Sequence, residues 1–160
     1  MEGALLMNLT PENRPALYRA LIRNSNDSGF VLHNHIRITQ LDDCYAEGEL
    51  DICPESLNRW GFVHGGCLVS LADTVGGVAA TTTGRSTVTL NNTFNFLRPA
   101  SGTKIKCTAR AVKVGRTVAV FRCTLTDDRE REVANGDFTF FFTAADLGRL
   151  LENVPEEPAD

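Results

Sequence analysis

A polar, glycine-bearing segment runs directly into an apolar stretch at residues 58–73, NRWGFVHGGCLVSLAD. The side chains here that could take part in chemistry include the amide of Asn58, the imidazole of His64 and the carboxylate of Asp73. Burying an unpaired carboxylate costs several kcal/mol. Asp73 is therefore paired, turned to solvent or used in a reaction.

Residues 65–81 contain no proline and many small side chains, which predicts one buried helix that begins near Gly65. The first backbone N–H groups of a helix lack intrahelical partners and lie at the positive end of its dipole. A glycine there lets a substrate carbonyl approach closely. This arrangement is typical of an oxyanion hole, and a nearby carboxylate such as Asp73 could attack the carbonyl or activate water.

The predicted donor and carboxylate cannot meet within one chain. Asp73 follows Gly65 by eight positions, or about 12 Å along a helix axis. It follows His64 by nine positions, and at about 100° per residue the two side chains lie on opposite faces. The two functions meet only if a second copy of the helix runs antiparallel beside the first. Small residues predict that such an approach is possible: Ala72, Gly76, Gly77, Ala79 and Ala80.

The segments that must position this helix are predicted to be mostly strands. TPENRPALYRALIRN predicts a short opening helix capped by Thr10 or Asn13. FVLHNHIRITQLD and CYAEGELDI alternate apolar and polar residues, which predicts two antiparallel strands. Four longer strands are expected after Gly84, with turns at 99–102, 115 and 127–128. This order indicates an α+β fold in which one long helix covers an antiparallel sheet.

The bulk composition bounds the class of protein. The 160 residues are 42% hydrophobic, which is enough for the core of one domain. A net charge of -4 argues against a nucleic-acid partner or a basic membrane surface. Five cysteines without C-x-x-C spacing predict reduced thiols and a cytoplasmic location. The acidic start MEGALLMNL and the lack of a long apolar run predict neither a signal peptide nor a membrane span.

Four short motifs stand out: N-x-x-G-x-x-H-G-G at 58–66, L-A-D at 71–73, FLRPA at 96–100 and VGR at 114–116. Together they resemble the acyl-CoA thioesterases of the phenylacetate-pathway (PaaI-like) and 4-hydroxybenzoyl-CoA thioesterase-like branch. The resemblance implies a hotdog fold, in which a curved antiparallel sheet wraps a long central helix. It also implies active sites between the protomers of a homodimer that often pairs into a homotetramer. No cofactor and no metal is expected. The predicted domains are a helical extension (1–29), the hotdog domain (30–145) and a disordered acidic tail (146–160).

The resemblance also assigns roles to individual residues. Asp73 would be the nucleophile or general base, and the N–H of Gly65 would bind the thioester oxygen. His64 would brace the turn, and Asn58 would hold the carbonyl or the water. Similar enzymes use a hydroxyl on the strand after the helix, which Thr89 matches.

Substrate-binding residues are expected at two further places. Arg98 and Arg116 are candidate partners for the phosphates of coenzyme A, because guanidinium groups pair well with phosphate. Gly66 and Gly115 are also expected to bind the substrate. The alternative for each arginine is a strand end in solvent, and for Gly115 a hairpin turn.

The predicted function is hydrolysis of an acyl-CoA, with an aryl, arylacetyl or medium-to-long fatty acyl group, to free acid and coenzyme A. The alternative is a hotdog module that binds acyl-CoA without cleaving it. A hydratase needs an aspartate and a histidine at one carbon, which the opposite faces of His64 and Asp73 disfavour.

Three other features have competing interpretations. Cys67 is either a nucleophile activated by the helix N-terminus or, as the apolar neighbours favour, a buried thiol. His33 and His35 would share a strand face, but no third metal ligand follows at a typical spacing. FTFFF at 138–142 predicts a buried strand, and DDRERE a solvated hairpin.

Overall fold

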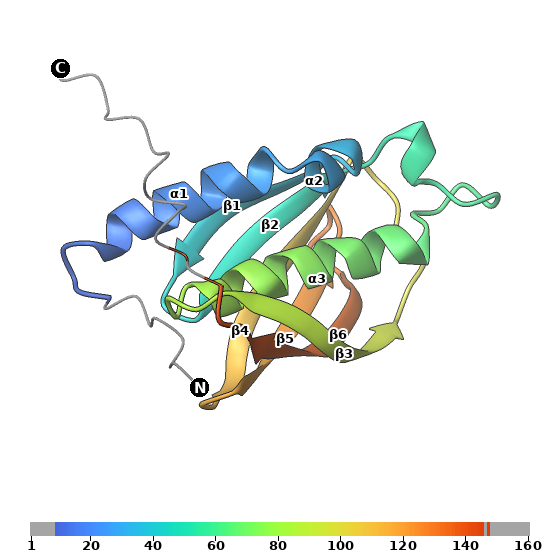
Figure 1. Ribbon diagram of the computed structural model, residues 1–160. Coiled ribbons are helices and arrows are strands. Elements are labelled where there is room, and N and C mark those ends of the chain that lie inside the picture. The colour runs from blue at the N-terminus through green and yellow to red at the C-terminus, as the bar shows by residue number, and fades with distance from the viewer. Residues whose placement is uncertain (1–8, 146, 148–160) are drawn as a thin grey trace, which may run out of the picture.

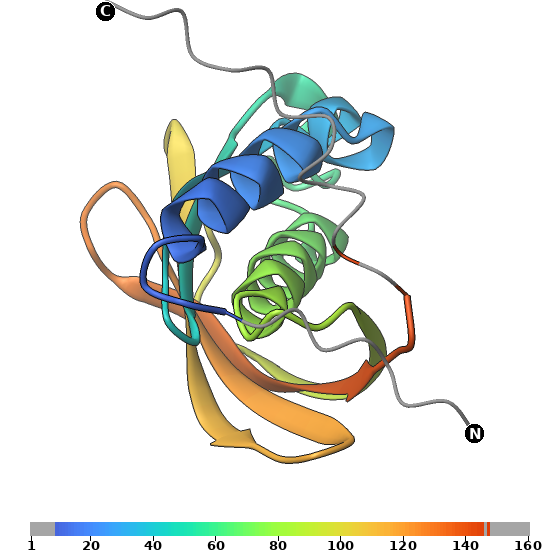
Figure 2. The same cartoon turned by 60° about the vertical axis from the view of Figure 1, so that its left-hand side comes forward.

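In the computed structural model, residues 9–145 and Leu147 are described. A curved sheet wraps around the long helix α3, with a second helix, α1, packed on the strand β1 (Figure 1; Figure 2). The elements in chain order are α1 (Arg14–Asn26), α2 (Gly29–His33), β1 (Ile36–Asp42), β2 (Tyr45–Asp51), the 3-10 turn η1 (Pro54–Ser56), α3 (Gly65–Thr81), β3 (Thr87–Phe96), β4 (Lys104–Val114), β5 (Val118–Thr126) and β6 (Glu132–Phe142). The predicted hotdog fold, with its preceding N-terminal helix, is confirmed. The predicted tail lies, apart from Leu147, outside the described residues.

The six strands form one antiparallel sheet in the order β1-β2-β4-β5-β6-β3. This order leaves β1 and β3 at the two edges, and β3 pairs only with β6. Within FTFFF, Phe138, Phe140 and Phe142 are buried while Phe141 is 41% exposed, as alternation along a strand requires. None of the helices in the described part of the chain has the length and hydropathy that a membrane span needs.

Helix α3 occupies the concave side of the sheet with the bounds predicted from the sequence. Its buried face includes Leu68, Leu71 and Val75, each at most 3% exposed. The helix ends at Thr81 and is followed by the cap residue Thr82, whose hydroxyl donates to the carbonyl of Ala79 (2.7 Å) and accepts from the backbone N–H of Cys44 (3.0 Å). The C-terminal end of the helix is therefore tied to the segment that leads into β2.

The small residues of α3 allow it to approach its own sheet. A Cβ added to Gly76 would lie 3.1 Å from Cζ of Phe140 and 3.2 Å from Sγ of Cys123. The thiol of Cys123 also donates to the carbonyl of Ala72 (3.4 Å). The expectation that these residues face a second helix is therefore wrong for most of them, because the buried face of α3 includes Ala72, Gly76, Ala79 and Ala80.

The predicted strand from Phe30 onward is also wrong in its first part. Residues 29–33 form the single turn α2, and β1 begins only at Ile36. Val31 is buried while Phe30 and Leu32 are exposed, so one helical turn mimics the alternation of a strand. His35 then adopts a left-handed φ of 54°, which turns the chain into β1. The two histidines therefore do not share a strand face.

Asp127 is a buried carboxylate that holds the turn between β5 and β6 together. Its Oδ1 accepts from the N–H groups of Arg129 (3.0 Å) and Arg131 (3.1 Å), and its Oδ2 accepts from the Arg131 guanidinium (2.6 Å). Asp127 is only 3% exposed. The Arg131 guanidinium and these N–H groups hold the pKa of Asp127 below its usual value. The segment DDRERE is thus a hairpin, but its first carboxylate is not solvated.

We expect Asp127→Ala to lower the free energy of unfolding by about 2 kcal/mol at pH 7, because several donors lose their acceptor. Since the pKa of Asp127 is lowered in the folded state, its contribution is complete above the unfolded pKa of about 3.9 and is lost as pH falls further. Urea unfolding of both proteins at pH 7 and pH 3 measures this. A difference in stability that stays the same at both pH values would contradict it.

Candidate active site

His64 caps the N-terminus of α3. Its Nδ1 accepts from the backbone N–H of Gly66 (2.9 Å), so the ring proton of the neutral side chain is on Nε2. Its own N–H donates to the carbonyl of Ser56 (2.8 Å), which ties the helix start to η1. The bracing role expected for His64 agrees with this geometry. The N–H of Gly66 is occupied by His64 and is not free for a substrate.

Gly65 offers the free backbone donor at this helix end. Its N–H has no hydrogen-bond acceptor among the described residues, and Gly65 lines a cleft of about 300 Å³. A Cβ at this position would lie 3.0 Å from Cε1 of Phe96, so the glycine lets the ring pack tightly against the helix start. The apolar walls of the cleft are Phe62, Val63, Leu68, Phe96, Pro99 and Ala100. The cleft can therefore hold an apolar group beside a polarising N–H.

Asn58 shapes the loop that enters the cleft. Its Oδ1 accepts from the backbone N–H groups of Trp60 (2.9 Å) and Phe62 (3.2 Å). This oxygen is therefore hydrogen-bonded within the loop, while the side-chain N–H₂ group has no partner within the described part of the chain. Asn58 also lines the cleft. It can thus position the loop and still offer a donor to a carbonyl or a water.

Asp73 lies midway along α3 and is held by Thr89. The Thr89 hydroxyl donates to Oδ1 of Asp73 (2.7 Å), and Thr89 lies on the edge strand β3. The structure therefore brings together two candidates that are sixteen positions apart in the sequence. Oδ2 of Asp73 has no partner among the described residues and is available for a reaction.

Gly65 and Asp73 remain separated within the chain. They belong to the same helix, and eight residues of helix span about 12 Å. Arg98 lies at the cleft beside Gly65, where its guanidinium donates to the carbonyl of Glu132 (2.5 Å). One protomer thus carries the Gly65 N–H and Arg98 at the N-terminal end of α3, and the carboxylate of Asp73 farther along the same helix.

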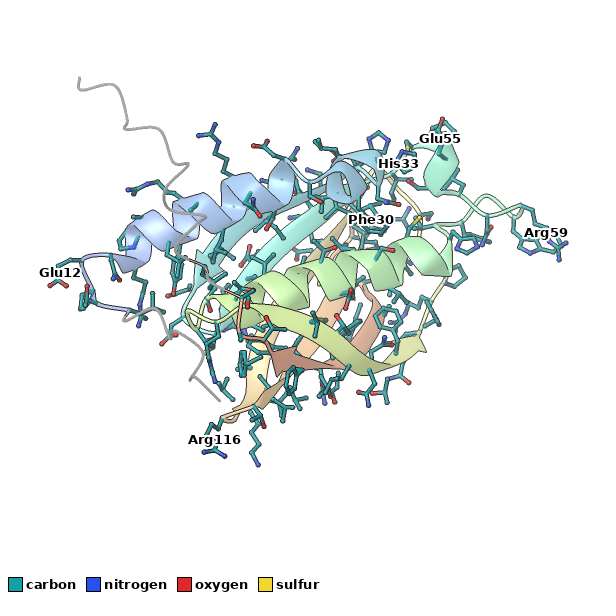
Figure 3. All side chains as sticks on the ribbon, viewed as in Figure 1. Glu12, Phe30, His33, Glu55, Arg59 and Arg116 are labelled. Atoms are coloured by element: carbon teal, nitrogen blue, oxygen red, sulfur yellow. The ribbon has the colours of Figure 1, made fainter. Side chains whose placement is uncertain are left out.

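Gly115 and Arg116 lie near the other end of α3. Arg85, just after this helix, donates to the carbonyls of both residues, each at 3.1 Å. The N–H of Gly115 donates to Val118 (2.8 Å), so Gly115 closes the β4–β5 turn. Figure 3 shows Arg116 at the opposite side of the molecule from Arg59. Within one chain these residues do not join the cleft, and their binding of substrate stays a prediction.

Cys67 lies two positions after Gly65, but its thiol is not activated as a nucleophile. Burial raises the pKa of its thiol, which disfavours the thiolate. Its Sγ points to the carbonyl of Ser56 at 3.7 Å. The interpretation as a packed thiol therefore fits, and Asp73 remains the candidate for chemistry.

The cleft walls were missed by reasoning from the sequence. Phe62 and Phe96 come from segments more than thirty positions apart and meet only in the folded chain. Phe96 opens the FLRPA segment, which was noted for its resemblance without a role for the ring. Trp60, beside the cleft-lining Asn58, carried no assignment either.

The chain matches known proteins in sequence and structure. A family model described as the thioesterase superfamily matches residues 61–134. An esterase of Mycobacterium tuberculosis is 32% identical over 107 residues, which cover 63% of this chain and 76% of the relative. The acyl-coenzyme A thioesterase PaaI of Escherichia coli is 30% identical over 100 residues, covering 62% and 71%.

Two solved structures agree with these relatives. The structure of a Mycobacterium tuberculosis esterase is 30% identical with a TM-score of 0.71, covering 74% of this chain and 98% of that one. A thioesterase of Streptococcus pneumoniae solved with coenzyme A is 25% identical with a TM-score of 0.71, covering 78% and 98%. The sequence relatives and the shared fold lead to one conclusion. The chain belongs to the thioesterase superfamily, as a thioester hydrolase of the PaaI-like hotdog type.

Proposed function

We propose that this protein hydrolyses acyl-CoA to free acid and coenzyme A at a site shared by two protomers. Asp73 of one protomer would act on a thioester bound at Gly65 of the partner subunit. The name of the Escherichia coli relative, an acyl-coenzyme A thioesterase, and the coenzyme A bound to the Streptococcus pneumoniae thioesterase support this substrate class.

One observation carries the proposal. The free N–H of Gly65 lies at an apolar cleft, whereas the Asp73–Thr89 pair lies about 12 Å along the same helix. Each half is prepared for thioester chemistry, and neither is sufficient alone. A second copy that runs antiparallel would supply the missing half to both clefts at once.

The edge strand β3 supports such a pairing. It is ten residues long, pairs only with β6, and exposes Val88 (51%) and Leu90 (56%). Long edge strands without protection present unpaired N–H and C=O groups to another chain. Two β3 strands paired antiparallel about a twofold axis would place two α3 helices antiparallel behind them. The pairing of such dimers into a homotetramer is a further prediction.

The proposed chemistry uses each polar group once. The Gly65 N–H and the dipole of α3 stabilise the oxyanion that forms when the thioester carbonyl is attacked. Asp73 either attacks the carbonyl carbon, giving an anhydride that water cleaves, or takes a proton from the water that attacks. The thiolate of coenzyme A leaves and is protonated. Thr89 occupies Oδ1 of Asp73 and so directs Oδ2 toward the reaction.

The test is a panel of thioesters from aryl and arylacetyl to long-chain acyl-CoA, followed by loss of thioester absorbance. A thiol reagent is unsuitable, because the partly exposed thiols of Cys44, Cys53 and Cys67 would also react with it. We expect turnover of at least one class, and the preferred acyl group identifies the substrate. Tight binding of every thioester without hydrolysis would overturn the proposal.

Thr89→Val removes the hydroxyl that positions Asp73. We expect kcat to fall about tenfold with little change in KM, because a hydrogen bond to a charged group is lost. Thr89→Ser keeps the hydroxyl and should restore most of kcat. Steady-state kinetics with the preferred thioester measures both variants. Native kcat in Thr89→Val, which keeps the shape of threonine without the hydroxyl, would show that the hydrogen bond to Asp73 makes no contribution.

A further inference from the structure

Trp60 is the one tryptophan of the chain, and 70% of its side chain is exposed. It belongs to the loop of residues 58–62, which projects beyond the N-terminal end of α3 (Figure 1). The guanidinium carbon of the adjacent Arg59 lies 4.8 Å from the centre of the indole ring. Figure 3 shows Arg59 reaching outward from the tip of this loop. An aromatic face and a cation are thus presented together.

This loop is held in one conformation by its own hydrogen bonds. The Asn58 side chain accepts from the N–H of Trp60, and the Asn58 carbonyl accepts from the N–H of Gly61 (3.0 Å). Gly61 has a φ of 80°, which favours glycine. The Asn58 N–H closes the loop on the carbonyl of Phe62 (2.8 Å). The exposed ring is therefore carried by an ordered loop. Aromatic and arginine side chains contribute much of the binding energy at interfaces, so this pair is a candidate for ligand binding.

The loop is continuous with the cleft. Asn58 and Phe62, on either side of Trp60 in the sequence, both line it. Gly65 follows Trp60 by five positions, so their Cα atoms lie within about 18 Å of each other. A ligand with its carbonyl at Gly65 and a long polar arm can therefore extend from the cleft to this loop.

We propose that Trp60 and Arg59 bind the nucleotide end of coenzyme A. The adenine stacks on the indole face that Arg59 leaves open, and the guanidinium pairs with a phosphate. Aromatic side chains bind bases by stacking, and guanidinium groups pair with phosphate oxygens. This inference rests on the proposed function, because it takes coenzyme A as part of the substrate.

The chemistry of the loop favours the nucleotide over the acyl group. Apolar walls for an acyl group are already present in the cleft, from Phe62 and Phe96. A cation beside an acyl chain would be desolvated without a partner, which is costly. Beside a phosphate, Arg59 is paired. The protein has a net charge of -4, so attraction of this anionic end depends on local cations such as Arg59.

Because no other tryptophan is present, indole fluorescence reports on Trp60 alone. The native protein is titrated with coenzyme A, with its adenosine bisphosphate half, and with pantetheine. We expect the first two to quench the emission and pantetheine to leave it unchanged. Quenching by pantetheine without quenching by the adenosine bisphosphate would overturn the proposal, as would no response to any of the three.

The kinetic test compares one acyl group carried by coenzyme A and by pantetheine. In Trp60→Ala we expect KM for the acyl-CoA to rise about 5- to 100-fold, as for loss of one stacked base, with kcat unchanged. The preference of the native enzyme for acyl-CoA over acyl-pantetheine should shrink accordingly. Trp60→Phe keeps a stacking face and should recover most of it. Phe30→Ala, which removes another exposed aromatic ring, serves as the matched control.

The outcomes separate this inference from the proposed function. If the native enzyme cleaves both thioesters equally well and Trp60→Ala changes neither, the function stands and the nucleotide site is wrong. An equal rise in KM for both substrates would place Trp60 at the acyl group or the pantetheine arm. Dissociation of the Trp60→Ala oligomer, measured by sedimentation, would place Trp60 at a protomer interface. Either result overturns the inference. If neither thioester is cleaved, the proposed function fails, and the fluorescence titration still decides whether the nucleotide binds.

Discussion

Asp73→Asn should lower kcat for acyl-CoA hydrolysis by about 100- to 10,000-fold, as for loss of a general base or nucleophile. Asparagine has the shape of aspartate and keeps an oxygen that can accept the hydrogen bond from Thr89. It carries no charge, so it neither attacks the thioester nor takes a proton from water. The variant should therefore bind substrate with a KM within a few-fold of the native value.

Loss of thioester absorbance measures kcat and KM, and thermal unfolding checks that the variant is folded. Asp27→Asn is the matched control, because Asp27 is an exposed carboxylate at the C-terminal end of α1. It should retain full activity. Native turnover in Asp73→Asn would remove Asp73 from the mechanism and leave its bond to Thr89 with only a structural role.

The sequence was most informative where one element determines the outcome locally. The bounds of α3 followed from the residues around Gly65 and from the absence of proline up to Thr81. The resemblance pointed to a hydroxyl on the strand after the helix at Thr89, and the structure adds that this hydroxyl is bonded to Asp73. Both results depend on the types of residues in or next to the one long helix, whose bounds are clear in the sequence.

Features that depend on which surfaces meet could not be predicted. A row of small residues shows that something packs closely, but the sequence does not say whether Gly76 meets a second helix or, as found, Phe140 of its own sheet. One turn of helix at Val31 gives the same short alternation as a strand. The walls of the cleft are formed by Phe62 and Phe96, which only the complete fold brings together.

Gly65→Val should lower turnover by about 100- to 1000-fold, comparable to loss of one oxyanion donor. Even a single added Cβ would lie 3.0 Å from Phe96, and the branched side chain would fill the space where a carbonyl reaches the N–H. The helix should still form, because His64 and Gly66 are unchanged. Circular dichroism and the kinetic assay test this. Native kcat with a bulky residue 65 would exclude this N–H as the oxyanion donor.

The two inactive variants, mixed, decide whether the site is shared. In a dimer of one Gly65→Val and one Asp73→Asn protomer, one site carries both defects. The other combines an intact Gly65 with the intact Asp73 of the partner subunit. Random mixing gives about half mixed dimers, each with one working site of two, so about a quarter of native activity should return. Unfolding and refolding the variants together, with each refolded alone as the control, measures this recovery. If both groups acted within one chain, every protomer would carry one defect, and the mixture would stay as inactive as its parts.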